Sequence, residues 1–337
     1  MNHSRKENTL SFSKTESPLQ SDLVAELATF WEDLFGVSYE KFRSVLAGSE
    51  QGLNRNFLYM ARNGSKLVGT TQLTLSGLCP RLGGLGEVAT AASHRRNGIG
   101  RRLCEQARDE FLDLGGEAIL LGTVNPAAAQ LYYRLGWRKL ASTNVMCLVK
   151  GHRSPEEFFV EHFRGEREVS VAAGDAAQRI GMIPLLVCPH DGRILDANLH
   201  LFSTRYAVQS SCMSLFPRYE ALCDRENGQW FAATTSDGCL VGLASARRRD
   251  ANTVQVDGFS HRNFHDASRH LLMACVRWAS DHGANRCLAQ VASDEEERCD
   301  LFDSLDFSQA GDGQNVDMDG TIIPTISFTK DCAGTTS

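Results

Sequence analysis

The chain has 337 residues, 42% of them hydrophobic and 23% charged, and a net charge of −6 at pH 7. This length exceeds what one hydrophobic core usually needs and suits two domains of about 150 residues each. The negative net charge argues against a broad nucleic-acid-binding surface, and the lack of a long apolar run argues against a membrane-spanning segment.

The N-terminal residues 1–20 are polar and rich in Ser and Thr, without the apolar core of a signal peptide. They predict a disordered lead, and the missing signal predicts a cytoplasmic protein. The chain also holds 11 cysteines and no C-x-x-C pair. This usage indicates buried, reduced thiols rather than disulfides or metal ligands.

Residues 21–150 carry a regular pattern of apolar positions and turn signals. The spacing of apolar residues, together with capping residues and terminal glycines, predicts helices at residues 21–36, 39–46, 99–115 and 125–135. Strands, two of them joined at the hairpin signal Asn63-Gly64, are expected at residues 57–62, 66–75, 85–90 and 118–123, with one or two more over residues 138–150.

A basic loop punctuated by glycine connects the third strand to the third helix. Gly98 and Gly100 lack the side chains that would keep a phosphate away from the backbone N–H groups at the start of the helix. Arg95 and Arg96 add positive charge around those groups. The loop therefore predicts an anion-binding turn, and a plain strand-to-helix connection is the alternative.

A second motif lies downstream, where Asn125-Pro126 supplies a cap and a first-turn proline for the next helix. Together, R-x-x-G-x-G at residues 95–100 and N-x-x-A…L-Y-x-x-x-G-W at residues 125–137 resemble the two motifs of the GCN5-related N-acetyltransferase (GNAT) family. The resemblance covers roughly residues 21–150. It implies an α/β (α+β) fold, with a mixed central sheet flanked by helices, and acetyl-CoA as co-substrate.

The resemblance also implies where acetyl-CoA binds, with its pyrophosphate on backbone amides of the loop and its pantetheine arm beside the preceding strand. The residues expected to bind it are Val88, Ala89, Thr90, Arg95, Arg96, Asn97, Gly98, Ile99, Gly100, Arg101 and Asn125. Asn125 could contact the cofactor arm or simply cap its helix. A strand N–H near Val88 is expected to stabilise the oxyanion of the tetrahedral intermediate.

The catalytic residues implied by the resemblance are Tyr132 and Glu87. Tyr132 matches the family's general acid, which protonates the departing thiolate. Glu87 could accept the proton of the amine, although family members that use such a glutamate carry it at the position of Gly84. Strand alternation would also turn Glu87 away from the face of Val88 unless a bulge intervenes. A water chain to solvent is the alternative base.

The second half of the chain resembles a degenerate repeat of the first. Asp237-Gly238 repeats the hairpin Asn63-Gly64, and Gly283 repeats the helix-ending Gly115. Two further anchors match Ser260-His261-Arg262 to residues 93–95 and Leu301-Phe302 to residues 131–132. This tandem arrangement predicts a lead at 1–20, a GNAT domain at 21–150, a linker at 151–166, a degenerate GNAT-like domain at 167–330 and a tail at 331–337.

In this alignment the second half lacks the residues that the first half would use to bind acetyl-CoA and to catalyse the transfer. The pairs are Gly98 with His265, Gly100 with Ala267, Asn125 with Glu295, Tyr132 with Phe302 and Gly136 with Asp306. The second domain is therefore expected not to be catalytic. Its histidines, His261, His265 and His270, have no Cys or carboxylate partner at matching spacing, so no metal site is predicted.

The function implied is acetyl-CoA-dependent transfer of an acetyl group to a primary amine of a small molecule or peptide, without a metal. One alternative is a regulatory protein that binds acyl-CoA without transfer, and another is a transferase for a different acyl group. The acceptor cannot be identified from the sequence, because one GNAT fold serves many amines. We expect no nucleic-acid or membrane partner, and a monomer or a homodimer.

Overall fold

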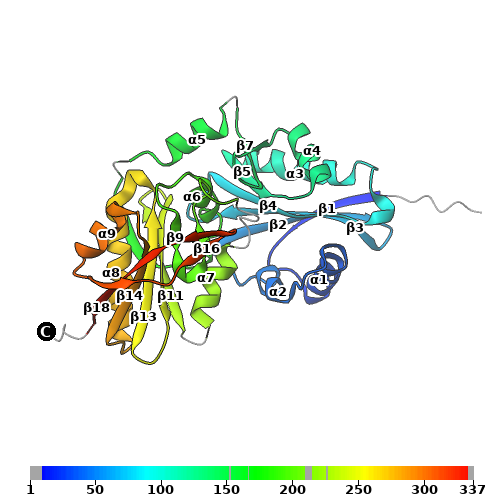
Figure 1. Ribbon diagram of the computed structural model, residues 1–337. Coiled ribbons are helices and arrows are strands. Elements are labelled where there is room, and N and C mark those ends of the chain that lie inside the picture. Colours follow the sequence, from blue (N-terminus) through cyan, green and yellow to red (C-terminus); the bar gives the residue numbers. More distant parts are fainter. Residues whose placement is uncertain (1–9, 152, 166, 209–214, 225–226, 333–337) are drawn as a thin grey trace, which may run out of the picture. The chain divides into compact units, whose positions relative to one another are not determined.

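Figure 1 shows the computed structural model, which describes residues 10–151, 153–165, 167–208, 215–224 and 227–332. Within these ranges the chain folds as two compact units. The first runs to Lys139 and includes Met146–Pro155, whereas the second comprises Leu140–Val145 and the chain from Glu156 onward. In the part of the chain that is described, no helix is both long and apolar enough to span a membrane.

The first unit is built on a seven-stranded mixed sheet with strand order β1-β2-β3-β4-β5-β7-β6. Strands β1 to β4 pair antiparallel, and β4 pairs parallel with β5. The strands are β1 (Leu10–Glu16), β2 (Asn54–Asn63), β3 (Lys66–Ser76), β4 (Leu82–Thr90), β5 (Ala118–Gly122), β6 (Arg138–Lys139) and β7 (Val145–Val149).

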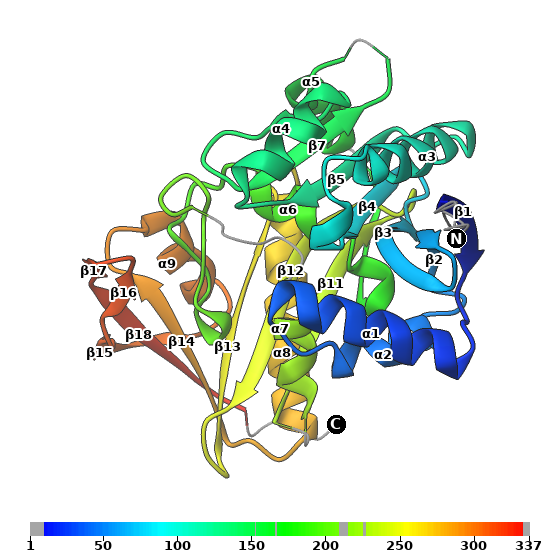
Figure 2. The same cartoon turned by 90° about the vertical axis from the view of Figure 1, so that its right-hand side faces the viewer.

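Helices cover both faces of this sheet, with α1 and α2 on one side and α3 and α4 on the other (Figures 1 and 2). The helices are α1 (Ser21–Phe35), α2 (Glu40–Leu46), α3 (Ile99–Asp113) and α4 (Pro126–Arg134). Trp31 of α1 packs with Leu58 on one face, and Phe111 of α3 packs with Leu73 on the other. The amphipathic spacing in the sequence therefore gives each helix the apolar side that the sheet buries.

The prediction of a disordered lead over residues 1–20 is wrong where the structure describes it. Residues 10–16 form strand β1, which pairs with β2 from Leu10 opposite Asn63 to Glu16 opposite Phe57. Phe12 packs against the core of the first unit, and the guanidinium of Arg102 lies 3.9 Å from its ring centroid. This short polar strand is stabilised by pairing with a distant segment, which its own composition does not reveal. Residues 1–9 lie outside the described residues.

The second unit repeats the topology of the first. Its main sheet has the order β8-β11-β12-β13-β14-β18-β15, which matches β1-β2-β3-β4-β5-β7-β6 strand by strand. The parallel neighbours, β13 and β14, also fall at the matching place. The strands are β8 (Val169–Ala173), β11 (Gly228–Thr235), β12 (Leu240–Arg248), β13 (Thr253–Ser260), β14 (Arg286–Ala292), β15 (Ser308–Asp312) and β18 (Thr325–Asp331).

The helices of the second unit occupy the matching positions in the chain. Helices α6 (Met182–Val187) and α7 (Leu215–Cys223) lie between β8 and β11, as α1 and α2 lie between β1 and β2. Helix α8 (His265–Asp281) follows β13, and α9 (Glu296–Asp303) follows β14. Two small sheets are added, formed by β9 (Ile194–Asp196) with β10 (Leu201–Phe202) and by β16 (Val316–Met318) with β17 (Thr321–Ile323). The predicted fold, two α/β halves each with a mixed sheet flanked by helices, is confirmed.

The segment predicted as a linker contains helix α5 (Pro155–His162), which the sequence analysis did not predict. The end of this helix packs within the second unit. Phe163 stacks on His261 with ring centroids 4.3 Å apart, and Asn263 Nδ2 donates to the Phe163 carbonyl at 2.7 Å. The second unit therefore begins several residues before position 167. The predicted tail begins inside β18, and residues 333–337 lie outside the described part.

Two carboxylates of the second unit are fully buried, Asp196 at the end of β9 and Asp257 in β13. Asp196 accepts hydrogen bonds from Ser245 Oγ at 2.8 Å, Asn198 N at 3.0 Å and Tyr219 OH at 3.1 Å. Burial, and then the negative charge of Asp257, raise the pKa of Asp196 to about 7. Because an unfolded aspartate has a pKa of about 3.9, the folded state binds the extra proton between these two values.

Protonated Asp196 should therefore contribute fully to the stability of the folded state below about pH 4, and this contribution should be lost as the pH rises to about 7. We expect Asp196→Asn to weaken this dependence, so that its stability relative to the wild type is greater at pH 8 than at pH 5. Urea denaturation at pH 5 and pH 8 measures the difference. The exposed carboxylate variant Asp300→Asn is the control, and equal pH dependence of Asp196→Asn and the wild type would contradict the assignment.

Candidate active site

Strand β4 contains a bulge at Glu87 and Val88. Thr70 of β3 pairs with Ala89 and Gln72 pairs with Gly86, so two residues of β4 stand opposite Thr71. Glu87 has a φ of 47°, a left-handed conformation that non-glycine residues rarely adopt. In a regular strand, alternation would point the side chains of Glu87 and Val88 to opposite faces. The bulge interrupts that alternation, so this argument against Glu87 no longer applies.

The bulge is held by a hydrogen-bonded chain from α1. Trp31 Nε1 donates to Thr70 Oγ1 at 2.9 Å, and Thr70 Oγ1 donates to the Glu87 carbonyl at 2.7 Å. In a planar trans peptide the carbonyl and the next N–H point in opposite directions, so the N–H of Val88 is directed away from Thr70. Neither Trp31 nor Thr70 was predicted as a site residue, because their contact joins positions far apart in the sequence.

Tyr132 lies on α4 and is 5% exposed. Its ring packs against Trp137 with centroids 6.1 Å apart, and its hydroxyl has no hydrogen-bond partner among the described residues. Burial raises the pKa of Tyr132, and the nearby groups of Cys104 and Glu87 add to this effect. Tyr132 therefore keeps its proton at neutral pH and is chemically able to donate it.

Tyr39, between α1 and α2, is a further group beside Glu87 that the sequence analysis missed. Burial, and then the charge of Glu87, raise the pKa of Tyr39. Its ring lies 5.2 Å from Trp31, and its backbone N–H donates to Glu32 Oε1 at 2.9 Å. Glu87 thus acts electrostatically on two tyrosines from different helical segments. The aromatic residues around position 39 were the available signal, but their spacing also fits an ordinary core.

The loop between β4 and α3 leaves the start of α3 open to an anion. Gly98 is the N-cap residue of α3, with a φ of 76°, and no side chain caps this helix end. A Cβ on Gly98 would meet no atom within 4 Å, so Gly98 is needed for its conformation rather than for space. The first N–H groups of α3 have no partner within the helix and are available to a ligand or to water.

The other predicted loop residues surround this helix end. Arg95, Arg96, Asn97 and Arg101 are exposed, and the Nε of Arg95 donates to the Thr90 carbonyl at 3.1 Å. Arg101 pairs with Glu105 at 2.8 Å, so part of its charge is already balanced. Ile99 is buried on the core side of the helix. A Cβ on Gly100 would come within 3.4 Å of Thr90 Oγ1, so this glycine brings the helix close to β4.

The remaining predicted residues have structural contacts of their own. Ala89 is buried in the core beneath α1, so only its backbone could touch a ligand, whereas Val88 packs towards the α3 side. Asn125 Oδ1 accepts hydrogen bonds from Ala127 N at 2.9 Å and Ala128 N at 3.3 Å. Of the two interpretations of Asn125, the structure shows the helix cap.

Backbone hydrogen bonds place the second unit's residues in register with the first. Trp137 N donates to the Tyr132 carbonyl at 3.0 Å, and Phe307 N donates to the Phe302 carbonyl at 3.1 Å. Asn125 and Glu295 are likewise the N-cap residues of α4 and α9. The predicted pairs Tyr132 with Phe302 and Asn125 with Glu295 therefore occupy matching positions.

The predicted match of residues 260–262 to residues 93–95 is wrong by three positions. Ala91 N donates to the Val68 carbonyl, and its counterpart His261 N donates to the Val241 carbonyl. Short 3-10 turns follow at Ala92–His94 and at Arg262–Phe264. However, α8 begins at His265, directly after its turn, whereas α3 begins only at Ile99. The open loop that separates the 3-10 turn from α3 in the first unit is therefore replaced by helix in the second unit.

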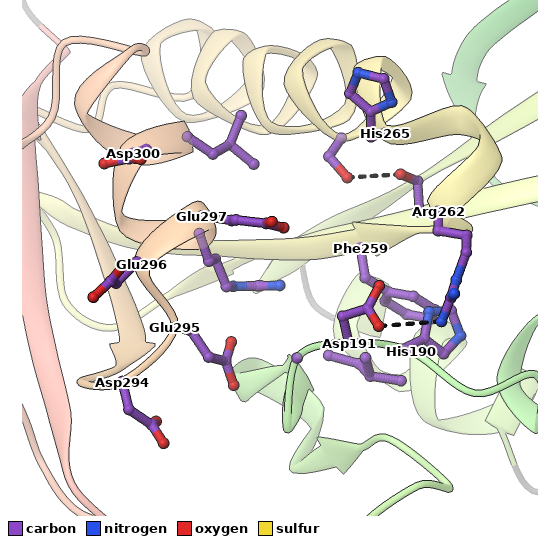
Figure 3. Close-up of a pocket in the computed structure, with 16 residues that line it drawn as sticks. His190, Asp191, Phe259, Arg262, His265, Asp294, Glu295, Glu296, Glu297 and Asp300 are labelled. Carbon is purple, nitrogen blue, oxygen red and sulfur yellow. Dashed lines mark hydrogen bonds and ion pairs between the residues drawn. The ribbon is translucent and has the colours of Figure 1, made fainter.

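A cavity of about 920 Å³ lies in the second unit beside the end of β13 and the starts of α8 and α9. Figure 3 shows that its labelled lining residues are mostly acidic, with Arg262 on the opposite side from α9. The lining carboxylates are Asp191, Asp294, Glu295, Glu296, Glu297 and Asp300, and the lining arginines are Arg262 and Arg298. This charge disfavours a polyphosphate ligand.

Among the described residues, no group of three His, Cys, Asp or Glu side chains is placed to hold a metal ion.

The first unit combines a mixed sheet covered by helices on both faces with an open, basic helix start at α3. Residues 23–137 match the family model described as "Acetyltransferase (GNAT) family". This part of the chain therefore matches the GNAT family, as the two motifs predicted. No curated protein matches the chain in sequence.

Solved structures similar to about half of this chain include several acetyltransferases. A GNAT-family acetyltransferase from Streptococcus pneumoniae is 13% identical, with 49% of this chain and 99% of that chain covered and a TM-score of 0.37. An N-acetyltransferase from Staphylococcus aureus is 11% identical, with 50% and 99% covered and a TM-score of 0.40. A phosphinothricin acetyltransferase from Sinorhizobium meliloti, in complex with AcCoA, is 13% identical, with 48% and 88% covered and a TM-score of 0.39.

Proposed function

We propose that the protein is an acetyl-CoA-dependent N-acetyltransferase that transfers an acetyl group to a primary amine in its first unit. The observation that carries the proposal is the bulge at Glu87, which lies in the same strand that leads into the uncapped start of α3. The bulge frees a backbone N–H for the reacting carbonyl, and the helix start offers donors for phosphates.

The residues of the first unit fit acetyl-CoA in its family role. The amides from Arg95 to Arg101 would hold the pyrophosphate, with the side chains of Arg95 and Arg96 adding charge. The backbone of Val88, Ala89 and Thr90 would lie beside the pantetheine arm. Since Asn125 Oδ1 is used as a helix cap, only its Nδ2 remains to contact the cofactor.

The reaction would be attack of a neutral amine on the thioester carbonyl. The N–H of Val88 would stabilise the negative oxygen of the tetrahedral intermediate, and Tyr132 would protonate the departing thiolate. Glu87, or a water molecule, would accept the proton that the amine loses. The charge that Glu87 exerts on Tyr132 and Tyr39 supports its place near the reacting groups.

We further propose that the first unit is the catalytic domain and that the second unit does not bind acetyl-CoA. The second unit has a phenylalanine in place of Tyr132 and a helical turn in place of the loop. Its matching cavity is lined by carboxylates. These three differences support a scaffolding role.

We expect isothermal calorimetry to give one acetyl-CoA bound per chain. The double variant Glu296→Lys/Glu297→Lys, which makes the acidic cavity less negative, should leave this stoichiometry and the affinity unchanged, because both residues are exposed in the second unit. Binding of two molecules per chain, or a loss of affinity in this variant, would contradict the assignment of the site to the first unit.

The acetyl transfer itself is tested by release of free CoA thiol with a panel of primary amines, including polyamines, aminoglycosides and peptide N-termini. We expect thiol release that requires both acetyl-CoA and at least one amine. Tight acetyl-CoA binding without release for any amine would favour a regulatory acyl-CoA-binding protein. Release with another acyl-CoA but not with acetyl-CoA would change the acyl group.

A further inference from the structure

Two buried cysteines of the second unit lie unusually close together. The Sγ atoms of Cys287, in β14, and Cys332, directly after β18, are 2.9 Å apart, although the residues are separated by 45 positions. A disulfide bond has a length of about 2.05 Å, so the two sulfur atoms need to approach by less than about 1 Å to form one. The sequence, with no C-x-x-C pair, gave no sign of this proximity.

The sheet positions the two thiols. Cys287 pairs with Lys330 and Arg286 pairs with Asp331, so Cys332 lies two residues beyond the partner of Cys287, diagonally across the ladder. The backbone of Cys332 is also fixed, because its N–H donates to the Asn285 carbonyl at 2.8 Å and its carbonyl accepts from Ser280 Oγ at 3.3 Å. The proximity is therefore built into the ladder and its end.

Only one of the two thiols faces an opening. Cys332 is 8% exposed and lines a cavity of about 350 Å³, together with Arg277, Lys330 and Phe307. Cys287 is fully buried, and this burial, followed by its hydrogen bond with Cys332, raises the pKa of its thiol. A small oxidant can therefore reach Cys332 before it reaches Cys287.

We propose that Cys287 and Cys332 are a site of reversible oxidation, at which a peroxide converts the two thiols into an intramolecular disulfide. In the first step the sulfur of Cys332 attacks hydrogen peroxide, the O–O bond breaks, and a sulfenic acid and water form. In the second step the sulfur of Cys287 attacks the Cys332 sulfur. The S–O bond breaks, and the departing hydroxide takes the Cys287 proton as a second water.

The disulfide would tie the end of β18 to β14 and close a loop that contains α9 and β15. Cross-linking residues this far apart restricts the unfolded chain, so the oxidised protein should melt roughly 5–10 °C higher than the reduced one. A reducing agent such as dithiothreitol should reverse the shift.

The test is peptide mapping of the full chain after treatment with hydrogen peroxide, denaturation and alkylation of the remaining thiols. We expect a peptide linking Cys287 to Cys332 in the wild type and in the control Cys275→Ala, which removes another fully buried thiol near Cys287. In Cys287→Ala the sulfenic acid of Cys332 should persist and react with dimedone. In Cys332→Ala no link should form.

The wild type alone decides the proposal if either variant fails to fold. Alkylation of both Cys287 and Cys332 after peroxide treatment would overturn it. So would linkage of Cys332 to any other cysteine, or oxidation of Cys332 to a sulfinic acid without the link.

Discussion

Gly98→Glu is expected to abolish acetyl-CoA binding, with affinity falling at least about 100-fold, or about 2.7 kcal/mol. The new carboxylate would stand at the uncapped N-terminus of α3, where the proposed site offers its N–H groups to the pyrophosphate. A Cβ at this position meets no protein atom within 4 Å, so the substitution acts on the ligand rather than on the packing. Isothermal calorimetry with acetyl-CoA measures the loss.

Gly115→Glu is the matched control for this variant. Gly115 follows the other end of the same helix, has a φ of 90° and also has open space around its Cβ position. Both variants carry the same charge and a comparable left-handed strain of about 1–2 kcal/mol, although the helix dipole disfavours the carboxylate only at Gly115. Gly115→Glu should therefore lower the melting temperature at least as much as Gly98→Glu does. Only Gly98→Glu should lose acetyl-CoA. Equal affinities in the two variants would remove the loop from the cofactor site.

The two motifs could be predicted from the sequence because each is local. The loop at residues 95–100 and the cap at Asn125 are formed by residues within a few positions of one another, and the structure places them at helix starts as expected. The repeated fold was also predictable, since hairpin signals and helix ends recur in the same order in both halves.

Features that depend on contacts between distant segments could not be predicted in the same way. The bulge at Glu87 depends on Thr70 and Trp31, which belong to a different strand and a helix. The sequence showed only that a bulge was required for Glu87 to face the site. Strand β1 is similar, because its stability comes from pairing with β2 rather than from its own apolar content.

The displaced alignment of residues 260–262 has a different cause. The triplet Ser-His-Arg occurs in both halves by coincidence. The alignment was based on this triplet and did not consider that the loop after it could differ in length between the two halves. The structure shows that the second unit shortens this loop and extends the helix, since α8 starts directly after its turn. The correction supports the proposal that the second unit does not bind acetyl-CoA, because the backbone conformation changes as well as the side chains.

Tyr132→Phe is expected to lower the turnover number about 10²–10⁴-fold while acetyl-CoA affinity stays within about twofold. The substitution removes only the hydroxyl, so the packing against Trp137 is retained. The second unit already holds a phenylalanine at the matching position, where Phe302 packs against Phe307 with ring centroids 5.2 Å apart. A phenylalanine ring is therefore compatible with this position of the fold. A loss of activity in Tyr132→Phe would then reflect the missing hydroxyl in the reaction rather than a loss of stability.

Tyr133→Phe separates the role of Tyr132 from a general effect of removing a tyrosine hydroxyl in α4. Tyr133 is 59% exposed, and its ring lies under the guanidinium of Arg138 at 4.5 Å, away from the buried face that carries Tyr132. Its variant should keep normal turnover. If Tyr132→Phe also kept normal turnover, the thiolate would have to be protonated by water. The buried tyrosine would then serve only to pack the helix, and the buried, still protonated state of its hydroxyl would have no part in catalysis.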